Sequence, residues 1–130
     1  MSPLKSRPSQ AGTVRIAPMG GCVGALIHGL NLDDIDAATS ATLTQALHEH
    51  GVLFYRHSAP GDVTDKQFMR LAEAFGEILV YPYRYKDYPV EDERLNFVDM
   101  DSRQSKGART SVWHTDGTPE ERPPQAALLN

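Results

Sequence analysis

Apolar residues recur at helical spacing over residues 36–50, where the pattern predicts the first helix. The apolar positions of this stretch are Ala38, Leu43, Ala46 and Leu47. Aspartates lie near its start and histidines near its end, as the helix dipole favours. Gly51 follows directly and is suited to end the helix in the left-handed conformation.

A second helix is predicted after residue 64, and its signals are stronger. Thr64 is followed three residues later by Gln67, which is the pattern of a capping box. A single apolar stripe then occupies Phe68, Leu71, Ala72 and Phe75. Gly76 is placed to end this helix.

Short apolar runs bounded by glycine or polar residues predict the strands. We expect two early strands within residues 14–16 and 23–30. Residues 52–56 form a continuous apolar run that is typical of a buried strand. Further strands are predicted over residues 78–80 and 95–100.

Composition narrows the class of protein without identifying its chemistry. The chain has 130 residues, of which 40% are hydrophobic, so one globular domain is expected over residues 13–130 after a flexible lead-in at residues 1–12. Its 13 basic and 17 acidic residues give a net charge of −4, which argues against nucleic acid or an anionic membrane as a partner. One cysteine cannot form an internal disulfide, and neither a signal peptide nor a membrane span is visible, so we expect a cytoplasmic protein.

His114 and Asp116 are the candidate chemical pair. Residues two apart on an extended strand point to the same side, so the imidazole and the carboxylate would converge there. Two such groups can share one metal ion, and one further histidine would complete the two-histidine, one-carboxylate site that favours non-haem Fe(II). The alternative is that both are surface polar residues near a turn.

The surroundings of this pair carry a family resemblance. The segment Trp113–Thr118 (WHTDGT) is followed by Glu121–Pro124 (ERPP), and upstream lie Gly24–Leu32, His50–Arg56 and Phe75–Glu77. In this order and at these separations, the segments resemble the N-terminal half of the TauD/TfdA family of Fe(II)- and 2-oxoglutarate-dependent dioxygenases. The resemblance implies a mixed α/β, mainly β fold, namely a double-stranded β-helix (a jelly roll, clavaminate synthase-like) with flanking helices.

The same resemblance implies roles for individual residues. His114 and Asp116 would be iron ligands, with 2-oxoglutarate as the co-substrate that binds the iron and O₂ as the oxidant. The family hydroxylates an unactivated C–H bond of a small-molecule substrate while 2-oxoglutarate leaves as succinate and CO₂, and a sulfonate or another anion is the expected substrate here. Tyr81 and Thr110 would contact substrate, although Tyr81 is equally well explained as an amphipathic residue at a rim.

The family also uses a second histidine and an arginine that pairs with the distal carboxylate of 2-oxoglutarate, both located further downstream. No residue of this chain is assigned to either role, so we expect an incomplete domain that binds metal weakly and does not turn over alone. Its partner would be a complementing C-terminal half or a second copy. The alternative function is a non-catalytic binding or interaction module. Pro119 departs from the aromatic residue usual in the family, so the turn after the ligands is expected to differ locally.

Overall fold

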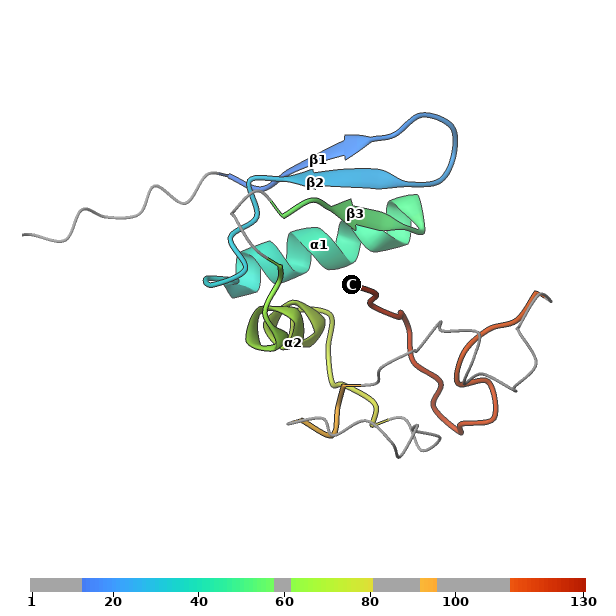
Figure 1. Cartoon of the computed structure of the whole chain (residues 1–130). Helices are drawn as coiled ribbons and strands as arrows, with labels where there is room; N and C mark the ends of the chain where they lie inside the picture. The colour runs from blue at the N-terminus through green and yellow to red at the C-terminus, as the bar shows by residue number, and fades with distance from the viewer. Residues whose placement is uncertain (1–12, 58–61, 81–91, 96–112) are drawn as a thin grey trace, which may run out of the picture. The chain divides into compact units, whose positions relative to one another are not determined.

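The computed structural model describes residues 13–57, 62–80, 92–95 and 113–130. The chain forms two compact units, Met1–Phe75 and Gly76–Asn130. Within the described residues, every helix and strand belongs to the first unit (Figure 1), which is therefore mixed α/β. The lead-in expected at residues 1–12 lies outside the described residues and remains a prediction.

A three-stranded sheet forms the centre of the first unit. Strand β1 (Arg15–Pro18) pairs with β2 (Ala25–His28) in antiparallel fashion, and β2 pairs with β3 (Leu53–Tyr55) in parallel, in the order β1-β2-β3. The β1–β2 connection is a short hairpin in which the Met19 N–H donates to the Gly24 carbonyl at 3.0 Å. Parallel neighbours need a long crossover, and here the first helix provides it.

Helix α1 (Ala37–His50) begins and ends as the sequence predicts. The Asp36 side chain accepts a hydrogen bond from the Thr39 N–H at 2.7 Å, which satisfies one of the unpaired donors at the helix start. This hydrogen bond lowers the pKa of Asp36 below its usual range. At the other end, Gly51 takes a φ of 70° and donates its N–H to the Leu47 carbonyl.

Helix α2 (Asp65–Glu73) confirms the capping box and corrects its predicted end. The Thr64 side chain accepts from the Gln67 N–H, and the Gln67 side chain accepts from the Thr64 N–H. The helix stops before the last residue of the predicted stripe, Phe75. Its buried residues are Met69 and Leu71, so the inward face is turned slightly from the predicted one.

The core of the first unit lies between the sheet and the helices, with α1 running beside the strands (Figure 1). Its buried apolar residues are Ala25, Ile27, Leu30, Leu32, Leu43, Ala46, Met69 and Leu71. The prediction of a buried third strand was wrong for Phe54, which is 47% exposed. Phe54 lies opposite Leu26 in the sheet register, on the face away from the buried Ile27. Among the described residues, helices cover only the other face.

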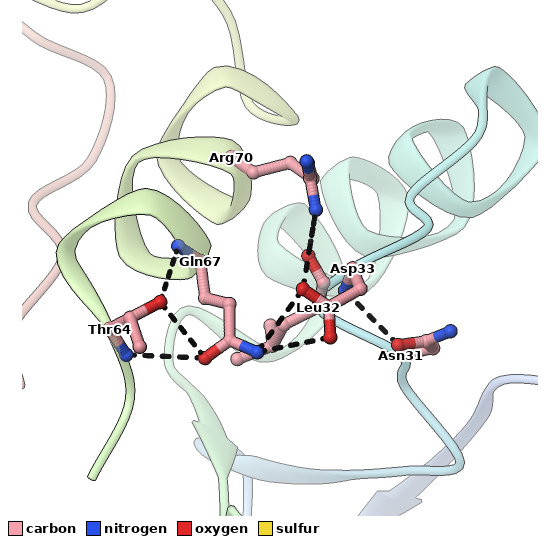
Figure 2. A network of polar contacts seen from close by, with 6 residues as sticks. All are labelled: Asn31, Leu32, Asp33, Thr64, Gln67 and Arg70. Atoms are coloured by element: carbon pink, nitrogen blue, oxygen red, sulfur yellow. Dashed lines mark hydrogen bonds and ion pairs between the residues drawn. The ribbon is translucent and has the colours of Figure 1, made fainter.

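Polar contacts attach α2 to the loop that follows β2 (Figure 2). The Asp33 carboxylate accepts from Gln67 Nε2 at 3.1 and 3.2 Å and forms an ion pair with Arg70 at 3.5 Å. Arg70 also donates to the Leu32 carbonyl at 3.1 Å. Gln67, which completes the capping box of α2, thus also joins this helix to Asp33, a residue more than thirty positions earlier in the chain.

The described part of the second unit contains turns and irregular segments without an assigned strand. Residues 78–80, predicted to be a strand, are irregular, since no described segment pairs with them. Leu95 is buried and ends a turn in which its N–H donates to the Asp92 carbonyl, while residues 96–100 of the predicted strand lie outside the described ranges. The Arg94 guanidinium beside Asp92, at 2.6 Å, holds the pKa of that carboxyl at about 2.

Neither α1 nor α2 has the length and apolar character needed to cross a membrane, and these are the helices of the described ranges.

Candidate metal site

The side chains of His114 and Asp116 converge, as the motif predicts. His114 Nε2 lies 3.6 Å from Asp116 Oδ1, and both side chains reach solvent, with exposed fractions of 49% and 65%. The pair does not lie on an extended strand, because residues 113–115 have no regular structure and Asp116 starts a turn. The pairing therefore comes from the path of the turn and not from the alternation of a strand.

The turn that follows the pair is closed by one backbone hydrogen bond. The Glu120 N–H donates to the Gly117 carbonyl at 3.0 Å. Gly117 takes a φ of 72°, in the left-handed region that side chains other than glycine rarely adopt. It is also buried, although its neighbours on both sides are exposed. The residue directly after Asp116 is thus buried and has a backbone conformation that favours glycine.

The donor set suits a divalent transition metal. A neutral imidazole nitrogen and a carboxylate oxygen are both common ligands of such ions. The 3.6 Å between His114 Nε2 and Asp116 Oδ1 brings the two donor atoms close enough that one ion could bind both. No set of three histidine, cysteine, aspartate or glutamate residues able to hold a metal occurs within the described ranges, so the pair offers two candidate donors and no third donor accompanies it there.

The other four histidines of the chain lie in the first unit, in or beside its helices and strands. His48 and His50 lie in the last turn of α1, which confirms their interpretation as helix C-terminal residues. His28 ends β2. His57 Nδ1 lies 3.4 Å from the Tyr55 hydroxyl, which also donates to the Leu30 carbonyl. Burial, with a smaller contribution from the charge of Asp33, raises the pKa of Tyr55.

The remaining predicted site residues lie outside the described residues. Tyr81 and Thr110, assigned to substrate, fall in the ranges 81–91 and 96–112. Their roles remain predictions.

Sequence comparison decides the family. Residues 15–130 match the family described as "Taurine catabolism dioxygenase TauD, TfdA family". The chain belongs to the TauD/TfdA family. The match covers both His114 and Asp116, and the first unit from β1 onward.

Individual relatives in the curated set agree with this assignment. The chain is 34% identical over 115 residues to an alpha-ketoglutarate-dependent sulfate ester dioxygenase of Pseudomonas putida, covering 88% of this chain and 36% of the relative. It is 32% identical over 131 residues to an alkylsulfatase of Acinetobacter baylyi, covering 99% of this chain and 38% of the relative. A third relative, an alpha-ketoglutarate-dependent dioxygenase of Penicillium expansum, is 28% identical over 112 residues, or 82% of this chain and 30% of its own. The chain thus spans between 30% and 38% of the length of these relatives.

Gly117 is the residue of this site that periodicity does not reveal. Neither the helical nor the strand pattern includes it, and its type alone does not show that it is buried. The Asp-Gly dipeptide is a turn signal, and it could have located the turn that the structure shows directly after the pair.

Proposed function

We propose that His114 and Asp116 are two ligands of the Fe(II) ion in a 2-oxoglutarate-dependent dioxygenase of double-stranded β-helix fold. The observation that carries this proposal is the convergence of His114 Nε2 and Asp116 Oδ1 to 3.6 Å in a chain of the TauD/TfdA family. With 2-oxoglutarate and O₂, the bound ion supplies the oxidation of a C–H bond, in which R–H, 2-oxoglutarate and O₂ give R–OH, succinate and CO₂.

The two side chains have distinct tasks in holding the ion. Asp116 supplies a negative charge that offsets part of the charge of a divalent cation, and His114 supplies a neutral nitrogen. Both side chains are partly exposed, so an ion that they held would be accessible to solvent. This openness is what a catalytic metal needs, because further ligands and substrate must reach it.

The substrate class we propose is a small organic anion, with an alkyl sulfate ester or a sulfonate as the specific candidates. Two of the relatives are named for sulfate ester or alkyl sulfate chemistry, which supports this choice. Tyr81 and Thr110 are proposed to contact the substrate. Succinate release with a panel of alkyl sulfates and sulfonates would test the class in a protein where these residues are accompanied by a third ligand and a 2-oxoglutarate-binding arginine.

The metal site itself can be tested on the 130-residue chain with Mn²⁺ as a redox-stable substitute for Fe(II). Trp113 is the single tryptophan, is fully exposed and directly precedes His114, so its fluorescence reports on this site. We expect saturable quenching of this fluorescence by Mn²⁺ in the native chain. Asp116→Asn and His114→Ala should each abolish the saturable part, because a single remaining ligand holds the ion poorly.

The matched control is His57→Ala, which removes a histidine that lies beside Tyr55 in the other unit. This variant should quench like the native chain. Equal quenching in Asp116→Asn and the native chain would show that Mn²⁺ binds elsewhere, and the proposed ligand pair would then be incorrect.

A further inference from the structure

Gly117 is in tight contact with Pro124 across the turn that follows the ligand pair. A Cβ atom built on Gly117 would lie 2.5 Å from Pro124 Cδ and 3.0 Å from Pro124 Cγ. In real structures, a Cβ atom essentially never comes within 3.0 Å of a carbon atom to which it is not bonded. Any side chain at residue 117 would therefore force the two backbone segments apart.

The backbone conformation of Gly117 adds a second restriction. Its φ of 72° lies in the left-handed region, where a side chain on an L-residue is strained. The other glycines with positive φ show how unusual the contact is: around Gly20, Gly21 and Gly76, nothing lies within 4 Å of a built Cβ. Only at Gly117 do a clash below 3.0 Å and a left-handed φ coincide among these residues.

We propose that Gly117 is a positioning residue for the metal ligands, acting through its contact with Pro124. Asp116 precedes Gly117 directly, and the hydrogen bond from Glu120 closes the turn on the other side. Pro124 has a fixed φ and a rigid ring, so it forms a stiff surface against which Gly117 rests. The contact sets the direction in which the chain leaves Asp116, and this direction aims the Asp116 carboxylate at His114.

This inference rests on the proposed function only for the nature of the ligand. The decisive variant is Gly117→Ala, which places the Cβ against the Pro124 ring. We expect its affinity for Mn²⁺, measured by Trp113 quenching, to fall by about tenfold or more, because the turn must shift and the carboxylate turns from His114.

Two further variants separate positioning from general strain. Gly21→Ala introduces the same kind of strain, since Gly21 has a φ of 74°, but it meets no neighbour, and it should bind Mn²⁺ like the native chain. Adding Pro124→Ala to Gly117→Ala removes the Cγ and Cδ atoms that cause the clash. Pro124→Ala alone should lower the affinity, because it removes the ring against which Gly117 rests. Adding Gly117→Ala to Pro124→Ala should then cost much less affinity than Gly117→Ala costs in the native chain, which a merely unfolded turn would not show.

A second readout needs no metal. In the native chain, nuclear Overhauser contacts should join the His114 ring to the Asp116 side chain, and they should weaken in Gly117→Ala but not in Gly21→Ala. If Gly117→Ala keeps both these contacts and the native affinity, the positioning role is incorrect. If Mn²⁺ does not quench the native chain but the contacts respond as expected, the proposed metal site fails while the positioning role stands.

Discussion

At the scale of single residues, Leu43 carries the most completely buried large side chain of the described residues, with no exposed surface. It sits on the inner face of α1, within the core between helix and sheet. Removing its side chain leaves a cavity that the rigid surroundings fill only in part. We therefore expect Leu43 to contribute far more to the free energy of unfolding than the exposed residues of the same helix.

Leu43→Ala should lower the free energy of unfolding of the first unit by about 2–5 kcal/mol. Urea unfolding followed by far-ultraviolet circular dichroism measures this loss. Leu129→Ala is the matched control, since Leu129 is 87% exposed and its truncation should change the unfolding free energy by less than about 0.5 kcal/mol. Similar losses in both variants would show that Leu43 is not part of a packed core.

The sequence predicts the two candidate ligands of the site but not the contact that follows them. His114 and Asp116 were identified because their types suit a metal and because the segments around them resemble the TauD/TfdA family, and the structure shows that the two side chains converge. They meet across a turn and not on an extended strand, because side chains two apart can converge in either arrangement. The contact of Gly117 with Pro124 was not predictable, since it depends on how seven residues fold back and not on any residue type alone.

At the scale of elements, the ends of α1 were predictable because each depends on a few neighbouring residues. The Asp36 side chain caps the first turn and Gly51 ends the last one, both through local hydrogen bonds. The strand predicted at residues 78–80 did not form, because a strand requires a partner that local sequence does not specify. Local chemistry therefore predicts helix ends better than strand pairing.

The cap of α1 makes the stability of the first unit depend on pH. The pKa of Asp36 lies below its ordinary value of 3.8 in the folded chain, because the Thr39 N–H favours the carboxylate. The unfolded state therefore binds the proton more readily, and stability rises with pH. The contribution of Asp36 is fully present above pH 3.8 and is lost as the pH falls through the lowered pKa.

Asp36→Asn isolates this effect, because asparagine also caps helices but does not titrate. Urea midpoints of the native chain should fall more steeply than those of the variant as the medium is acidified below the ordinary carboxyl pKa. Asp92, whose pKa of about 2 is also lowered, titrates in both chains and cancels in the comparison. Parallel pH profiles would contradict the assigned role of the cap.

At the scale of the whole molecule, two compact units divide the tasks. The first unit holds the helices and strands of the described residues, and the second holds His114 and Asp116, the proposed ligand pair. The family relationship covers both units without interruption, from residue 15 to residue 130.

The parallel pairing of β2 with β3 has a consequence for the order of folding. β1 and β2 can meet through a short hairpin, whereas β3 reaches β2 only after the chain from Gly29 to Val52 has been shortened. Bringing the two ends of this segment together costs conformational entropy when the segment is unfolded. Formation of α1 shortens the segment and so lowers this cost. The helix is therefore expected to be formed in the folding transition state.

Ala41→Gly tests this kinetic role, since Ala41 is an exposed residue of α1 and the change removes helix propensity without removing a core contact. The variant should lose about 1 kcal/mol of stability. Stopped-flow kinetics should assign most of that loss to slower folding. A change confined to the unfolding rate would mean that the strands meet first and the helix forms around an existing sheet.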